Sequence, residues 1–146
     1  MADIARLSLP QAARLLAATD PAAARGFLGL DPVTQNGALL VKEMTLRQIS
    51  VHQVGDALYG HAPNPHQPRQ AFVAATEADP TALRAFLGYL AAYRRHTSYV
   101  ALLPEGSPVT AGFEAGGFVR SGTLPDHAYR SGRYGDVAVY YAARED

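Results

Sequence analysis

The chain has 146 residues, and its 13 basic and 13 acidic side chains give a formal net charge of zero. Because like charges form no run, neither nucleic acid nor an anionic membrane is expected as a partner. The chain contains no cysteine, which excludes disulfides, thiolate metal ligands and cysteine nucleophiles. No apolar run approaches the ~20 residues that span a bilayer, so the sequence predicts a single cytoplasmic domain over residues 1–146.

The first part of the chain predicts a broken helix followed by a hairpin. Ser8 and Gln11 have the spacing of a capping box, and Asp20-Pro21 is expected to kink or restart the helix that follows. A polar stretch then leads to an antiparallel hairpin, in which apolar and polar residues alternate over residues 49–53 before a turn at Gly55-Asp56. Residues 63–68 carry three prolines, which predicts a loop.

The middle of the chain carries the strongest helix and strand patterns. The nearly unbroken apolar run of residues 70–75 is typical of a central strand. Asp79 and Pro80 are expected to begin a long helix that ends near residue 96, with an acidic cap and a proline in its first turn. Its expected apolar face comprises Leu83, Phe86, Leu87, Leu90 and Tyr93. The elements expected after it are a buried strand over residues 99–103, a short helix from about Ser107 to Gly116-Gly117, and strands near residues 118–122 and 137–141.

The last third of the chain carries the most informative motif. A short helix runs into Gly117-Phe118 and a strand, and Gly132-Arg133-Tyr134-Gly135-Asp136 precedes the terminal strand. This pattern resembles the end of the acyl-CoA N-acyltransferase (GNAT) superfamily. The resemblance implies an α/β fold, here somewhat truncated, with a mixed central sheet whose two parallel strands splay apart between flanking helices.

The same resemblance implies a reaction and its participants. A GNAT enzyme moves an acyl group from a thioester, either acetyl-CoA or phosphopantetheine on an acyl carrier protein, to the amine of a small-molecule or protein acceptor. A homodimer is compatible with this reading. The positions implied for donor binding lie on the central strand, at the start of the long helix and on the short helix: Val73, Ala75, Thr81, Ala82, Ser107 and Phe113.

The loop before the long helix departs from the family pattern. Where the family places glycines whose amides converge on the pyrophosphate, this chain reads Thr-Glu-Ala-Asp-Pro-Thr-Ala over residues 76–82. If Asp79 caps the helix, its carboxylate occupies amides that a phosphate needs and opposes the ligand's charge. We therefore expect acetyl-CoA to bind with a Kd of tens of micromolar or poorer, whereas a carrier-bound phosphopantetheine needs no such grip.

The short helix departs as well. Phe113 stands where the family keeps a tyrosine that protonates the leaving thiolate, and Gly106 stands where it keeps an asparagine. Phenylalanine has no proton to donate, and the loss of one positioned acid typically costs ~10²–10⁴ in rate. Tyr129 and Tyr134 are candidates for an acceptor pocket or a substitute acid. A degenerate, non-catalytic GNAT module that binds or regulates is the alternative to an enzyme.

Two side chains are candidates for acid–base chemistry. Glu77, just past the central strand, stands where the family can place the base for the amine, or it is a solvated loop acid. His61 lies opposite His52 on the predicted hairpin, and the pair either faces the cleft or lies on a solvated strand face. Together with His66 these residues fit no compact ligand spacing, so no metal is expected.

Overall fold

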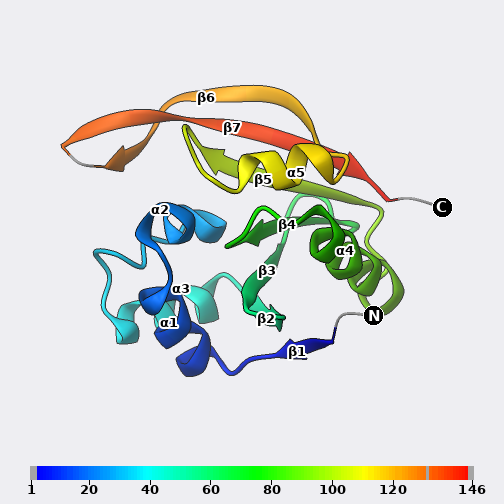
Figure 1. Cartoon of the computed structure of the whole chain (residues 1–146), viewed down its shortest axis with the longest axis horizontal. Coiled ribbons are helices and arrows are strands. Elements are labelled where there is room, and N and C mark those ends of the chain that lie inside the picture. The colour runs from blue at the N-terminus through cyan, green and yellow to red at the C-terminus, as the bar shows by residue number, and fades with distance from the viewer. Residues whose placement is uncertain (1–2, 131, 145–146) are drawn as a thin grey trace.

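The computed structural model describes residues 3–130 and 132–144, and over these residues the strands form one seven-stranded sheet in the order β1-β2-β3-β4-β5-β7-β6 (Figure 1). The strands are β1 Ile4–Arg6, β2 Ser50–Val54, β3 Ala57–Pro63, β4 Gln70–Ala75, β5 Ser98–Pro104, β6 Val119–Arg130 and β7 Arg133–Ala143. The helices are α1 Leu9–Ala18, α2 Pro21–Ala24, the 3₁₀ turn η1 Phe27–Gly29, α3 Gly37–Leu46, α4 Pro80–Arg94 and α5 Thr110–Ala115.

The sheet divides at its one parallel strand pair. β1 to β4 form an antiparallel half, and β5, β7 and β6 form another. β4 and β5 pair in parallel, and their register runs from Gln70–Ser98 to Phe72–Val100. Beyond these pairs the two strands continue to Ala75 and Pro104 and diverge. The splayed parallel strands expected from the sequence are therefore present.

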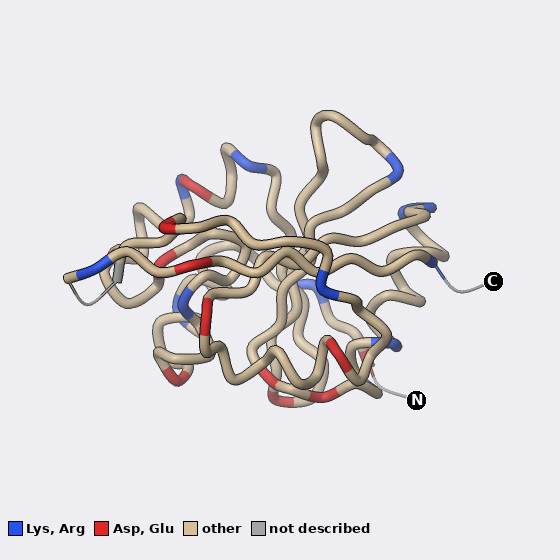
Figure 2. The backbone as a smooth tube through the Cα atoms, turned by 90° about the horizontal axis from the view of Figure 1, so that it is seen from above, with Lys and Arg blue, Asp and Glu red and all other residues tan. Residues whose placement is uncertain are grey.

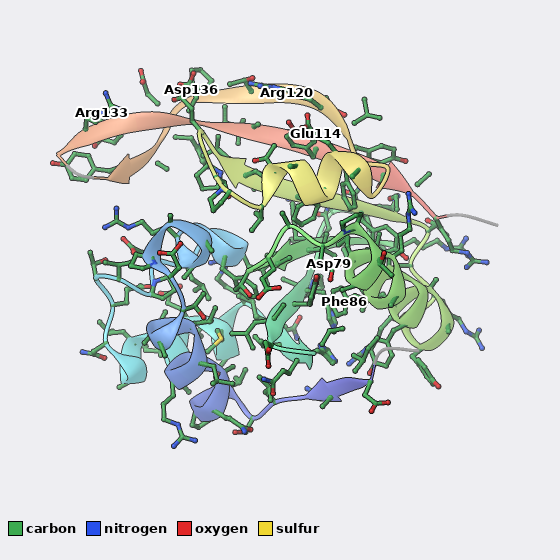
Figure 3. The ribbon with its side chains drawn as sticks, viewed as in Figure 1. Asp79, Phe86, Glu114, Arg120, Arg133 and Asp136 are labelled. Atoms are coloured by element: carbon green, nitrogen blue, oxygen red, sulfur yellow. The ribbon has the colours of Figure 1, made fainter. Side chains whose placement is uncertain are left out.

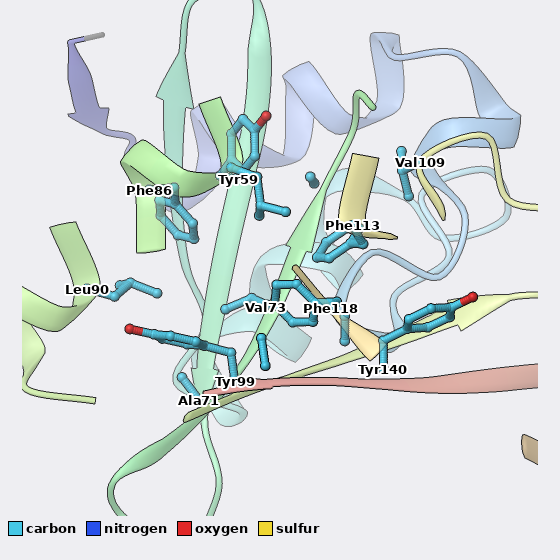
Figure 4. Close-up of a cluster of buried hydrophobic side chains, with 14 of the residues drawn as sticks. Tyr59, Ala71, Val73, Phe86, Leu90, Tyr99, Val109, Phe113, Phe118 and Tyr140 are labelled. Atoms are coloured by element: carbon cyan, nitrogen blue, oxygen red, sulfur yellow. The ribbon is translucent and has the colours of Figure 1, made fainter. Parts of the chain in front are cut away.

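Helices cover the two faces of the sheet, and each face has its own apolar core. α1, α3 and η1 pack on one face around residues such as Leu16, Leu40 and Met44. α4 and α5 pack on the other face, where aromatic side chains dominate (Figure 4). The labelled aromatic members of that second core are Tyr59, Phe86, Tyr99, Phe113, Phe118 and Tyr140.

Three of the local signals for helix ends are confirmed, at Ser8, Asp79 and Gly116-Gly117. The Gln11 amide donates to Ser8 Oγ at 3.3 Å, so Ser8 caps α1. Asp79 caps α4, whose proline stands in the first turn. Gly116 ends α5, and Gly117 adopts a φ of 101°, which favours glycine in that position.

The prediction of a polar stretch without a helix before the hairpin is wrong, because residues 37–46 fold as α3. Asn36 caps this helix by accepting from the Leu39 amide at 2.9 Å. Leu40 and Met44, four residues apart, are fully buried on its inner face. Between them stand Val41, the exposed Lys42 and the half-buried Glu43, so the buried apolar stripe is short and gave no clear helical pattern in the sequence.

Other boundaries and exposures also need correction. α4 ends at Arg94, and Tyr93 is 75 % exposed instead of lining the apolar face. α5 begins at Thr110, and β6 and β7 are much longer than expected. Charged residues are dispersed over the backbone (Figure 2), and in the described ranges no helix is long and apolar enough to cross a bilayer.

Candidate functional site

A cavity of about 580 Å³ opens where β4 and β5 diverge, on the face that carries η1 and α3. Phe72 and Val73 of β4 and Leu102 of β5 form its wall at the divergence. η1, the segment after α3 and the end of β3 contribute the remaining wall. A smaller cavity of about 260 Å³ adjoins it and shares Leu102. A small molecule placed in the larger cavity would therefore meet the diverging strands directly.

Three polar side chains line the larger cavity: Arg47, Gln48 and His127. The guanidinium of Arg47 donates from Nη2 to the carbonyl oxygen of Leu28 at 2.6 Å, which ties the end of α3 to η1. No aspartate or glutamate is among the described residues that line this cavity.

His127 reaches the cavity through an irregularity in β6. Leu124 pairs with Val137 and Ala128 pairs with Gly135, so three residues of β6 face Asp136 alone on β7. Within this bulge the Asp126 amide donates to Asp136 Oδ1 at 3.0 Å. Bulges of this kind re-aim side chains and are common beside active sites. Here the bulge brings His127, which is solvent-exposed, into the lining of both cavities.

Several backbone amides of the loop between β4 and α4 are already hydrogen-bonded within the protein. Asp79, labelled at the start of α4 in Figure 3, accepts through Oδ1 from the amides of Thr81 and Ala82, both at 3.1 Å. The Thr76 amide donates to the Leu58 carbonyl at 3.0 Å, and Thr76 Oγ1 accepts from the Leu58 amide at 2.9 Å. The amides implied for pyrophosphate binding at Thr81 and Ala82 thus already serve a protein carboxylate.

The short helix α5 lies directly against this loop. A Cβ added to Gly112 would stand 2.6 Å from Ala78 Cα and 2.9 Å from the Asp79 nitrogen. These distances are shorter than real Cβ contacts, so the close approach of the two backbones requires glycine there. α5 and the loop therefore touch along their backbones at this point.

The other positions implied for donor binding lie beside this contact. Val73, Ala75 and Phe113 belong to the core under α4 and α5. Phe113 is 1 % exposed, and its ring stands edge-on to Phe118 with centroids 5.0 Å apart. Ser107 lies in the turn before α5, and its Oγ accepts from the Val109 amide at 3.4 Å.

Glu77 is exposed in the loop and is not among the residues that line the larger cavity. Burial, with Asp79 and Glu77 adding to it, raises the pKa of Tyr59 above its usual value. The Tyr59 hydroxyl itself is buried and has no hydrogen-bond partner in the described structure. Glu77 lies in the loop after β4, as the sequence predicts. It does not line the cavity that His127 lines.

Of the two alternatives for His52 and His61, a solvated strand face is wrong, since the two side chains are only 1 % and 6 % exposed. Their rings stack with centroids 5.6 Å apart under Phe86 of α4, and His96 stands 6.1 Å from His61. Burial, aided by the charges of Arg6 and Arg94, lowers the pKa of His52 to about 4. Burial, aided by the neighbouring histidines and the same two arginines, lowers the pKa of His61 to about 3. His61 does not line the larger cavity, and among the described residues no three or more His, Asp or Glu side chains are arranged so that they could hold a metal ion.

A mixed sheet that splays between two parallel strands, with helices on both faces and a terminal β6–β7 hairpin, is the fold of the GNAT N-acetyltransferases. The chain matches spermidine N-acetyltransferase from Vibrio cholerae in complex with CoA and spermine, with a TM-score of 0.72, 16 % identity, and coverage of 97 % of this chain and 95 % of that one. It also matches the ribosomal alpha-N-protein acetyltransferase RimL in complex with coenzyme A, with a TM-score of 0.68, 14 % identity, and coverage of 97 % and 93 %. No protein-family model and no curated protein matches the sequence. At these identities the likeness shows the fold.

Arg47, Gln48 and His127 were not anticipated from the sequence. Arg47 and Gln48 follow α3, which was missed, and His127 depends on a bulge that leaves no periodic signal. Asp126, which adopts a φ of 49°, is the nearest hint of that bulge, since aspartate tolerates the left-handed region better than most residues. The Pro-Asp pair at residues 125 and 126 marks an interruption, but it does not reveal where the next side chain points.

Proposed function

We propose that the chain is a GNAT-type N-acyltransferase that moves an acyl group from a thioester to an amine held in the larger cavity. One observation carries the proposal: the cavity opens at the divergence of β4 and β5, with Phe72, Val73 and Leu102 in its wall. A thioester lying between the strands and an amine in the cavity would meet there. Holding both reactants in this geometry would remove part of the entropic barrier to the reaction.

The chemistry requires one bond to form and one to break. The amine nitrogen attacks the thioester carbonyl, the carbon–sulfur bond breaks, and the products are an amide and a thiol. β4 has no β5 pairing beyond Phe72, and we assign its backbone amides there the role of polarising the carbonyl. Since Phe113 has no proton to give, the thiolate takes its proton from solvent.

The proton of the amine needs an acceptor on the cavity side. His127 is the titratable side chain shared by both cavities, and we assign it this role ahead of Glu77. Glu77→Gln and His127→Gln form a matched pair, because each removes one candidate base. We expect His127→Gln to lower turnover about a hundredfold and Glu77→Gln to change it little. The opposite ranking, measured with saturating donor, would restore Glu77 as the base.

The donor is expected to be acetyl-CoA bound weakly, or phosphopantetheine on a carrier protein. Asp79 occupies the amides of Thr81 and Ala82, and its charge opposes a pyrophosphate at the start of α4. Calorimetric titration with acetyl-CoA should give a Kd of tens of micromolar or poorer. Submicromolar binding at ordinary salt would contradict this expectation.

The contact of Gly112 with Ala78 favours a second candidate, a GNAT fold that binds small molecules without transferring an acyl group. In that case the passage a pantetheine arm would use between α5 and the loop stays closed. The candidates separate in one assay, with acetyl-CoA and acetyl-pantetheine offered side by side to a panel of amines. Release of thiol together with an amide product, seen by mass spectrometry, supports the enzyme. If neither donor gives an amide product, the proposed function is wrong and the binding module is the remaining candidate.

A further inference from the structure

The larger cavity carries a positive charge that no acid balances. Arg47 is the cationic side chain among its lining residues, and aspartate and glutamate are absent from the described part of that lining. Asp31, an acid of the adjoining cavity, lies 3.8 Å from Arg25 and accepts from the Val33 amide at 3.2 Å. Its charge is therefore already matched. A polycationic ligand would meet no carboxylate among the described residues that line the larger cavity.

The Arg47 guanidinium is held at the cavity wall. One of its N–H groups donates to the Leu28 carbonyl, and its Nη2 would stand 3.0 Å from a Cβ on Gly29. A guanidinium has five N–H donors in a planar fork, so one bond to a carbonyl leaves four for a ligand. Because the side chain is already oriented, binding an anion there loses less side-chain entropy than an unrestrained arginine would.

The rest of the lining suits an apolar ligand body. Leu28, Leu46, Phe72 and Leu102 contribute aliphatic and aromatic surface, and Ala62 and Pro63 extend it. A volume of about 580 Å³ falls within the range that holds small organic ligands. The site thus combines one cation, tied to the Leu28 carbonyl, with an apolar wall at the divergence of the strands, and it is open to solvent at Leu46 and Arg47.

We infer that the acceptor is a small amino carboxylate with an apolar side chain, such as an apolar α-amino acid, whose carboxylate pairs with Arg47. This inference rests on the proposed function, because it names the amine that the transfer would use. A planar guanidinium pairs with a carboxylate through two parallel hydrogen bonds, which fixes the ligand's orientation as well as its charge. The expected product is an N-acyl amino acid, in which the carboxylate is unchanged.

The test measures binding and needs no turnover. N-acetyl-leucine, N-acetyl-leucinamide and N1-acetylspermidine are titrated into the intact chain by calorimetry. The acid should bind on the order of tenfold tighter than the amide or more, and the acetylated polyamine should bind weakest. Arg47→Gln should remove the preference for the acid, and Arg47→Lys should keep part of it, since a charge remains without the fork.

Arg14→Gln is the matched control, because it removes the same charge from the exposed face of α1 and should leave all three affinities unchanged. Thermal unfolding of each variant shows whether loss of the Leu28 bond has unfolded the site; if Arg47→Gln is unfolded, Arg47→Lys decides. Equal binding of acid and amide, a preference for the polyamine, no binding at all, or an unchanged preference in a folded Arg47 variant overturns the inference. If the chain prefers N-acetyl-leucine but transfers no acyl group, the carboxylate-binding site at Arg47 stands and the proposed acyltransferase function is wrong.

Discussion

At the scale of single residues, two glycines in helices show how differently the same residue type is used. Gly112 of α5 touches the backbone of Ala78 and Asp79, whereas Gly88 of α4 is exposed and has nothing within 4 Å of where a Cβ would stand. Helix propensity alone favours alanine over glycine by about 1 kcal/mol at both positions. The local contacts therefore decide the sign of the effect.

We expect Gly112→Ala to lower the free energy of unfolding by about 1–3 kcal/mol, because the methyl group forces α5 away from the loop. Gly88→Ala should raise it by about 0.5–1 kcal/mol. Chemical denaturation of the two variants beside the parent measures both changes. A stable Gly112→Ala chain would mean that α5 and the loop separate readily.

At the scale of elements, the sequence predicts those whose signals are local. The caps at Ser8 and Asp79 and the stop at Gly116-Gly117 depend on neighbouring residues, and each is where the pattern indicated. α3 was missed because its inward stripe consists of little more than Leu40 and Met44. The candidate cavity depends on that helix and on the β6 bulge, so its polar residues follow from tertiary packing and not from any motif.

The start of α4 offers a prediction at this scale. Asp79→Ala removes the acceptor for two amides, so the free energy of unfolding should fall by about 1 kcal/mol. The freed amides and the lost negative charge should at the same time strengthen binding of acetyl-CoA. Denaturation and calorimetry on the same variant test both parts. Weaker stability without any gain in donor affinity would indicate that the α5 contact, and not Asp79, limits binding.

At the scale of the whole molecule, buried neutral histidines couple folding to pH. His52 and His61 have pKa values of about 4 and about 3 in the fold, below the ordinary value of 6.5. Below pH 6.5 the unfolded chain binds protons that the folded chain does not, so stability falls as the pH falls. Arg6 and Arg94 work in the same direction, because their charges oppose a proton on either ring.

As the pH falls from about 6, we expect each of these two histidines to contribute a slope of about 1.4 kcal/mol per pH unit. This contribution ends at the pKa of the histidine or at the onset of unfolding, whichever is reached first. His52→Phe keeps an aromatic ring against Phe86 and Tyr89 and should flatten the decline. His66→Gln, in an exposed loop, is the control and should leave the decline unchanged. Denaturation curves collected from pH 7 to pH 4.5 measure the slopes, and identical slopes in all three chains would contradict the assignment.

The backbone contact of Gly112 with Ala78 and Asp79 also bears on motion. Any donor that enters between α5 and the loop must first find them apart, so its apparent affinity is the intrinsic one scaled by the fraction of molecules that are open. A donor that binds only the open form shifts the population of molecules toward that form. Donor binding and the separation of α5 from the loop are therefore thermodynamically coupled. Amide hydrogen exchange in α5 and in residues 76–82 would follow that equilibrium without the need for a reaction product.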